Sequence, residues 1–411
     1  MKLTKLEKYW VLYDVGNSAF TLLVSTIIPI YFNYLAGSAG LTDVQYLAYW
    51  GYAASIATLI VALSAPVLGT LADHKGYKKP IFVGTLAVGA IGCLALGLAK
   101  AWLVFLVVFV IAKTGYSASL VFYDAMINDV TEESRVDTVS SQGYAWGYIG
   151  SCIPFVLCLL LVLGSGAIGI SMELAMGLSF LIVAVWWVGS SMPLIKNYQQ
   201  RYYVERQPHP VRASFGRLAK TLRNVKQEKH IFIFLLAFFF YIDGVYTIID
   251  MATAYGSALG LDSTGLLLAL LVTQIVAFPC AIIFGRLAQK VRNSKLITVC
   301  IAAYLGIAIF AMFLHAQWQF WTLAVLVGMF QGGIQALSRS YFAKIVPNEK
   351  SGEYFGLMDI CGKGAAFFGT TIVSVVSQAT NNMNLGVGAI ALLFVAGIIL
   401  FRKAAKLNPG S

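Results

Sequence analysis

Twelve stretches of about 20 mostly apolar residues follow one another along the chain, and a stretch of that length crosses the hydrocarbon core of a bilayer as a helix. They lie near residues 10–34, 47–71, 80–99, 102–127, 138–163, 172–192, 231–256, 264–284, 296–314, 318–343, 354–378 and 385–402. Lipid offers no partner to an unpaired backbone group, so each stretch is expected to be a helix. The sequence therefore predicts an all-α polytopic membrane protein with twelve transmembrane helices.

The composition excludes a water-soluble fold. Hydrophobic residues make up 59% of the 411 residues and charged residues 11%, whereas soluble domains carry about 25% charged residues. If both termini are cytoplasmic, every Lys and Arg except Lys100, Lys113 and Lys363 falls on the inner side, as the positive-inside rule requires. We therefore expect a protein of a bacterial cytoplasmic membrane whose basic loops contact lipid headgroups and not nucleic acid. We also expect a monomer that binds no cofactor and no metal.

One long loop divides the predicted spans into two sets of six. Residues 193–230 carry many basic residues, opposed only by Glu205 and Glu228: Lys196, Arg201, Arg206, Arg212, Arg217, Lys220, Arg223, Lys226 and Lys229. Apolar residues recur there at helical spacing: Val211, Phe215, Leu218, Leu222 and Val225. This pattern predicts an amphipathic helix lying on anionic lipid headgroups, with docking of a partner as the alternative. The predicted units are residues 1–192, the linker 193–230 and residues 231–411.

The two sets of six spans echo each other. Gly69, Asp73 and Lys79 near the second span recur at one constant offset as Gly285, Gln289 and Lys295 near the eighth. Gly143 and Gly150 of the fifth span match Gly362 and Gly369 of the eleventh in the same way. These matches indicate two pseudo-symmetric six-helix bundles built from parallel repeats.

The loop after the second span carries a spaced motif, Gly69-x-x-x-Asp73-x-x-Gly76-x-Lys78-Lys79. A glycine at position 69 lets two helices approach closely, and Asp73 can bridge to a neighbouring helix end. Gly76 permits a tight turn. The motif resembles the loop motif of the major facilitator superfamily, although His74 stands where Arg or Lys is usual. In that family the motif gates the inner side, which would assign gating roles to Asp73, Gly76 and Lys78.

Three longer strings narrow the resemblance. They are Tyr13-Asp-Val-Gly-Asn17-Ser-Ala-Phe20, Tyr241-Ile-Asp243-Gly-Val-Tyr246 and Gly332-Gly-Ile-Gln335-Ala-Leu-Ser-Arg339-Ser340. Together they resemble the vacuole-effluxer-like branch of the major facilitator superfamily, which includes the autophagy-related vacuolar amino-acid effluxer and many bacterial proteins. Val15-Gly16 departs from the Trp-Ala that is common there. The resemblance implies the major facilitator fold, with spans one, four, seven and ten around a central cavity.

Charged residues inside spans are costly and usually face a partner or a water-filled cavity. Lys113 and Asp124 lie about three helical turns apart on one face of the fourth span, and Asp243 and Asp250 share a face of the seventh. Gln331, Gln335 and Arg339 form a polar stripe in the tenth span. Asp359 and Lys363 are spaced i, i+4, which is typical of a structural pair within one helix.

These positions give a set of candidate site residues. We expect substrate binding by Asn17, Lys113, Asp243, Tyr241 or Tyr246, Gln331 and Gln335. Asp243 and then Asp124 are the candidates for proton coupling, because coupling needs a buried carboxyl group that titrates between states. Asp14 and Arg339 are assigned to gating, with helix-end or headgroup contacts as the alternative.

A cavity that carries both signs of charge suits a zwitterion, with Asp243 meeting an ammonium group and Lys113 a carboxylate. The sequence thus predicts no enzyme but a secondary active transporter that moves amino acids or similar metabolites by alternating access, with export favoured and proton coupling as a hypothesis. Lipid, sugar or drug cargo remains an alternative. A second alternative is a metal-dependent membrane enzyme that uses the acidic cluster Asp124, Asn128, Asp129, Glu132 and Glu133.

Overall fold

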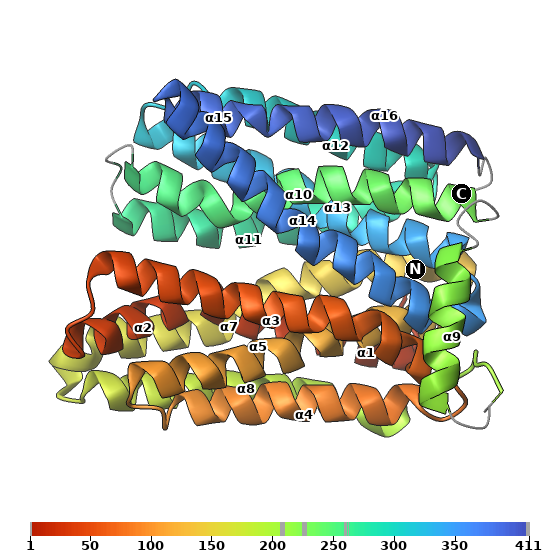
Figure 1. The fold of residues 1–411 in the computed structure, drawn as a ribbon, viewed down its shortest axis with the longest axis horizontal. Coiled ribbons are helices and arrows are strands. Elements are labelled where there is room, and N and C mark those ends of the chain that lie inside the picture. The colour runs from red at the N-terminus through yellow and green to blue at the C-terminus, as the bar shows by residue number, and fades with distance from the viewer. Residues whose placement is uncertain (1, 206–209, 224–227, 259–260, 262, 408–411) are drawn as a thin grey trace.

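The fold is built from long helices that run side by side along one axis (Figure 1). The computed structural model describes residues 2–205, 210–223, 228–258, 261 and 263–407. The first half comprises α1 (Lys5–Ser25), α2 (Ile27–Ser38), α3 (Asp43–Ala72), α4 (Lys78–Leu96), α5 (Trp102–Ala125), α6 (Ile127–Val130), η1 (Glu133–Arg135), α7 (Val136–Ile168) and α8 (Met172–Asn197). After α9 (Pro210–Arg223) come α10 (Lys229–Ala258), α11 (Ser263–Leu287), α12 (Asn293–Ala311), α13 (Gln317–Ile345), η2 (Asn348–Lys350), α14 (Ser351–Thr380), α15 (Met383–Ala389) and α16 (Ala391–Leu407).

The helices confirm the predicted membrane architecture. Within the described residues, 11 helical segments are long and apolar enough to cross a membrane. The first predicted span is formed by α1 and α2 together and the last by α15 and α16. The span predicted at 354–378 is not among these 11 segments; it coincides with α14, a helix of 30 residues that packs against α3 and α10.

Two groups of helices lie next to each other (Figure 1). We call α1–α8 the N-terminal bundle and α10–α16 the C-terminal bundle. They meet where α14 packs against α3, and where α7 packs against α11 and α13. Both ends of the chain and α9 lie at one end of the bundles, which we call the inner end (Figure 1).

The break between α1 and α2 follows from Pro29. Proline has no N–H, so the carbonyl of Ser25 loses its helical partner and the chain departs from helical geometry at Thr26, where φ is −130°. The hydroxyl group of Thr26 turns back to the carbonyl of Leu22 and is buried there. The two short helices therefore act as one bent span.

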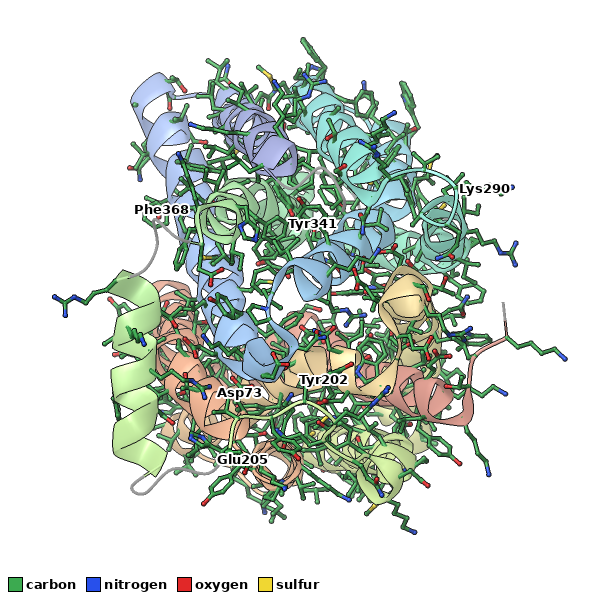
Figure 2. The ribbon with its side chains drawn as sticks, turned by 90° about the vertical axis from the view of Figure 1, so that its right-hand side faces the viewer. Asp73, Tyr202, Glu205, Lys290, Tyr341 and Phe368 are labelled. Carbon is green, nitrogen blue, oxygen red and sulfur yellow. The ribbon has the colours of Figure 1, made fainter. Side chains whose placement is uncertain are left out.

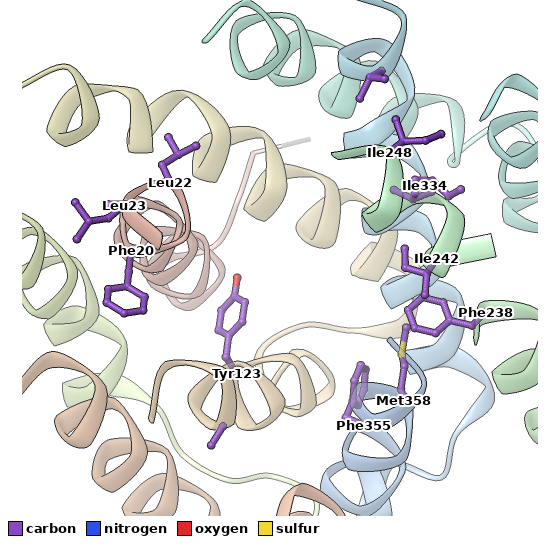
Figure 3. Close-up of a cluster of buried hydrophobic side chains, with 14 of the residues drawn as sticks. Phe20, Leu22, Leu23, Tyr123, Phe238, Ile242, Ile248, Ile334, Phe355 and Met358 are labelled. Carbon is purple, nitrogen blue, oxygen red and sulfur yellow. The ribbon is translucent and has the colours of Figure 1, made fainter. Parts of the chain in front are cut away.

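Each bundle has an apolar interior of aromatic and aliphatic side chains. Figure 3 shows part of this core, with Phe20 and Tyr123 in the N-terminal bundle and Phe238, Ile242 and Met358 in the C-terminal bundle. All five side chains are buried. This packing holds the helices on which the charged residues of the spans are placed.

Candidate functional site

Arg339 of α13 is the centre of a charge cluster between the two bundles. Its Nη1 donates to Asp124 Oδ1 at 2.9 Å, and its Nη2 lies 3.5 Å from Asp14 Oδ2. Its Nε and Nη2 also donate to the hydroxyl and carbonyl oxygens of Ser140, each at 2.9 Å. The three partners come from α5, α1 and α7, so one side chain of the C-terminal bundle is held by three helices of the other.

Aromatic rings enclose the same guanidinium group. Its Cζ lies 4.2 Å from the ring centroid of Tyr144 and 4.6 Å from that of Trp10, distances at which a cation is attracted to the ring face. Gly143 makes room for the cluster, because a Cβ there would lie 2.8 Å from Asp14 Oδ2. Breaking a buried ion pair by removing one partner costs about 3–5 kcal/mol, so we expect Arg339 to be a main tie between the bundles.

Polar side chains from both bundles surround this cluster. Asp124 is half-buried, and its charge and that of Asp359 both act on the hydroxyl groups of Tyr116 and Tyr246. The chain thus brings together α5, α10 and α14 around a group of carboxylates and tyrosines. Asp359 therefore faces the interface between the bundles, whereas the sequence predicted only a structural pair with Lys363. The side chain of its predicted partner, Lys363, lies outside the described residues.

A second set of contacts links α7 to the polar stripe of α13. Tyr148 donates to Gln335 Oε1 at 2.7 Å and interacts with Gln331, which is buried. In the N-terminal bundle Asn17 is buried and donates to Asp14 Oδ1 at 3.2 Å. Gln331 and Gln335 thus both face the other bundle.

Lys113 lies further along α5, away from the inner end. It is half-buried, and its Nζ sits 5.7 Å from the ring centroid of Phe109. Its charge acts on Asp250 of α10, which is exposed. Lys113 and Asp250 therefore place opposite charges on facing bundles, about three helical turns along α5 from Asp124.

Asp243 lies apart from these residues, inside the C-terminal bundle. It is fully buried, and its Oδ1 accepts hydrogen bonds from Gly369 N at 2.9 Å and from the Thr247 hydroxyl at 3.4 Å. Its Oδ2 is buried and has no hydrogen-bond partner among the residues that the structure describes. This placement does not support the expected direct contact between Asp243 and a substrate ammonium group.

Tyr241 also lies away from the interface. It is fully buried and shares a 2.7 Å hydrogen bond with Ser338. The N-terminal bundle contains an equivalent pair, Tyr13 and Ser119, also at 2.7 Å. Of the two tyrosines considered for the site, the structure therefore brings only Tyr246 to the interface, while Tyr241 packs one bundle internally.

The loop motif lies at the inner end, where α3 meets α14. A Cβ on Gly69 would lie 2.1 Å from the carbonyl oxygen of Gly352, so the two backbones are in contact. The carboxylate of Asp73 accepts hydrogen bonds from the N–H groups of Gly352 at 2.7 Å and Glu353 at 3.0 Å. These groups form the first turn of α14, where the helix dipole favours a negative charge. Gly76 turns the chain with φ at +81°.

Two basic residues complete this junction. Lys78 is fully buried and donates to Ser351 of α14 at 2.9 Å as well as to Asp129 at 3.0 Å. Arg217 of α9 lies 2.9 Å from Asp73 Oδ2 and 2.9 Å from Glu353 Oε2. Burial raises the pKa of Asp73 to about 7, because the positive charges of Lys78 and Arg217 offset only part of its desolvation.

The comparisons with known proteins agree with this geometry. A family model described as vacuole effluxer Atg22 like matches residues 38–406. The chain belongs to this family. It is 43% identical to YxiO of Bacillus subtilis strain 168, which is described as an uncharacterized MFS-type transporter, over 97% of this chain and 94% of that protein.

Solved structures show the same fold at low sequence identity. The human organic anion transporter MFSD10 superposes with a TM-score of 0.71 at 11% identity, covering 96% of this chain and 98% of that one. The Escherichia coli fucose:proton symporter FucP gives 0.70 at 17% identity, with 97% of both chains covered. The family match and the relative YxiO together identify the protein as a vacuole-effluxer-like transporter of the major facilitator superfamily.

Sequence reasoning missed several residues of this Atg22-like protein. Arg217 was one of many linker cations, and nothing in its spacing marked it as an ion-pair partner of Asp73. Tyr144 and Tyr148, in contrast, are spaced i, i+4 next to Gly143 in the fifth span. This spacing puts both rings on one side of the helix, and it could have identified them from the sequence.

A second inner junction mirrors the first. The side chain of Gln289, which stands where the repeat has Asp73, donates to Thr138 at the start of α7. Close by, Asp137 accepts from Asn293 at 2.7 Å and pairs with Lys344. The degenerate copy of the loop motif thus still joins the bundles, through an amide in place of a carboxylate.

The acidic cluster considered for a metal-dependent enzyme is a structural junction. Asp129 is buried and bound by Lys78, by the Tyr198 hydroxyl and by the backbone N–H groups of Arg201 and Tyr202. Asn128 donates to the carbonyl of Ala343. Over the described part of the chain no group of three His, Cys, Asp or Glu side chains could hold a metal ion. YxiO, which matches nearly the whole chain, is described as a transporter.

Proposed function

We propose that the protein exports amino acids or similar small zwitterions by alternating access, driven by protons. The observation that carries the proposal is the Arg339 cluster, in which a buried charge of one bundle is held by Asp14 and Asp124 of the other. Such a cluster can be broken and remade when the bundles rock, whereas a static scaffold has no need of it. The moving units are residues 1–192 and 231–411, joined by the linker 193–230.

The charges at the interface support a zwitterionic cargo. Asp124 keeps 28% of its side chain exposed while its Oδ1 binds Arg339, so the carboxylate can still accept an ammonium group. The charge of Asp124 acts on Tyr116 and Tyr246, so both tyrosines belong to the surroundings of this carboxylate. Lys113 supplies the positive charge for a carboxylate. Asp124 and Lys113 both belong to α5, and Tyr246 and Asp250 of α10 face them, so bound cargo would contact both bundles.

Asp243 supports proton coupling by its burial. A carboxylate in a span with one oxygen buried and unpartnered is costly, and a proton on that oxygen removes the charge. Asp124 is the second candidate, since loss of its proton would strengthen its pairing with Arg339. With Asp243 as the coupling group, cargo binding at Asp124 and proton binding at Asp243 would use different carboxyl groups, so the two can be tested separately.

The inner end is assigned to the cytoplasm of a bacterium, and the working unit to a monomer. The basic loops support that orientation. Export is favoured because the family description names an effluxer.

The test is transport in sealed liposomes. Purified protein is reconstituted, and uptake of a labelled panel of neutral, acidic and basic amino acids is recorded with and without an imposed pH gradient. We expect gradient-dependent uptake that Asp243→Asn loses and that Glu349→Gln keeps, because Glu349 is an exposed carboxylate outside the spans.

Two results would contradict the proposal at different points. If no amino acid is taken up, the cargo assignment is wrong, and sugars, lipids and drugs are screened next. If Asp243→Asn keeps gradient-driven uptake, the coupling role of Asp243 is wrong while the cargo assignment stands.

A further inference from the structure

The helix α9 lies across the inner end, roughly at right angles to the spans (Figure 1). In the end-on view it runs along the rim of the molecule, on the side opposite Lys290 (Figure 2). It packs against α3. A helix at this place lies where the headgroups of the inner leaflet surround a transporter of this length.

The two sides of α9 differ in an unexpected way. The side that faces the bundles is largely polar: Ser214 and Thr221 are buried, and Arg217 reaches the carboxylates of Asp73 and Glu353. Leu218 is the apolar residue of this side that packs against the core, among the side chains of α9 that the structure describes. Phe215 points away from the bundles with 56% of its surface exposed.

Basic residues share the outward side of the helix. Lys220 and Arg223 are exposed there, together with Phe215. An apolar side chain beside exposed basic residues is typical of a helix that lies in the interface of a membrane. If α9 served only to pack against the protein, its aromatic residue would be expected to turn inward.

We propose that the outward side of α9 binds anionic phospholipid headgroups of the inner leaflet, and that this binding stabilises the closed inner end. Charge complementarity identifies the partner: the linker 193–230 is strongly basic, and polybasic segments beside spans are attracted to anionic leaflets. Phe215 supplies the apolar anchor at the level of the headgroups.

Arg217 couples the position of α9 to the closure of the inner end, where α3 meets α14. This residue contacts Asp73 in the N-terminal bundle and Glu353 in the C-terminal bundle, so it can keep both partners only while the inner end is closed. When the bundles separate there, α9 loses at least one contact and its position on the leaflet changes. Binding and conformation are linked reciprocally, so a lipid that binds the docked helix better also favours closure.

The experiment uses the full chain in nanodiscs that contain phosphatidylcholine with and without phosphatidylglycerol. Hydrogen exchange is followed for peptides that cover 210–223. We expect slower exchange in α9 when the anionic lipid is present. The double variant Lys220→Gln/Arg223→Gln should lose that protection, by a factor of roughly thirty if each charge contributes as basic residues near an anionic surface usually do.

The matched control removes two exposed basic residues of another inner loop, Lys290→Gln/Arg292→Gln, and should keep the lipid dependence. Equal exchange in both lipid mixtures would overturn the proposal and leave a protein partner as the occupant of this side. Equal losses in the control and test variants would also overturn it, because the effect would then be a general one of net charge. No substrate is needed, so this test is independent of the cargo proposed above.

Discussion

Replacement of Arg217 by Ala should open the inner end of the transporter. The side chain is 17% exposed and serves two carboxylates that are fully buried, each at 2.9 Å. Removing one partner of a buried ion pair costs about 3–5 kcal/mol. Asp73 retains the N–H groups of Gly352 and Glu353, so the lower limit of about 3 kcal/mol applies. The ratio of closed to open molecules should then fall about a hundredfold.

The expected effect depends on pH in a defined direction. Burial already raises the pKa of Asp73 to about 7 in the closed state, whereas an exposed aspartate titrates near 4. Without Arg217 the pKa in the closed state rises further, and the closed state holds the proton more tightly than the open state. Opening by Arg217→Ala should therefore be greatest above pH 8 and fade as the pH falls below 7.

The assay is a distance measurement between spin labels at Lys75 and Glu349. Both residues are exposed and lie on opposite sides of the junction, and the labels are attached to a chain without its native cysteines. Lys196→Ala removes one charge from the linker without touching the gate and serves as the control. A closed-to-open ratio that changes less than about threefold in Arg217→Ala, or equally in both variants, would refute the reasoning.

Two further predictions concern the contacts between the bundles. Gly69→Ala should shift the same spin-label distance toward opening, because the added Cβ would meet the carbonyl of Gly352 at 2.1 Å, whereas Gly84→Ala, with open space around it, should not. Equal behaviour of the two glycine variants would contradict the close approach of α3 and α14. Arg339→Lys keeps the charge but loses the planar fork that serves Asp124 and Ser140, so transport should fall at least tenfold, and full activity would rule out a geometric role for the guanidinium group.

Hydropathy and charge placement predicted the fold because both are local properties of the sequence. The span boundaries, the basic linker and the repeat of Gly69 and Asp73 are visible without any tertiary contact. The same holds for Arg339, whose position at the end of a polar stripe identified a helix side facing the other bundle. Lipid imposes strong constraints on such residues, so their presence in a span is informative by itself.

The sequence could not show whether a polar side chain in a span faces the interface or the interior of its own bundle. Tyr241 and Tyr246 share one helix, and only packing against Ser338 shows that the first is structural. Asp243 was expected to face the cargo, but the close approach of Gly369 turns it into the C-terminal bundle. The pattern of α9 showed an amphipathic helix but not which side faces the protein, because that side is set by the ion pairs of Arg217.

Proton-driven transport through Asp243 is tested most directly by measuring the exchange of amino acid across the membrane separately from its accumulation. Liposomes that contain the Asp243→Asn variant are preloaded with the amino acid found active in the panel, and counterflow of labelled amino acid is measured beside uptake driven by a pH gradient. We expect the variant to keep counterflow, since Asp243 does not touch the interface, and to lose gradient-driven accumulation. A variant that accumulates substrate as well as the unaltered protein does would contradict proton-driven transport through Asp243.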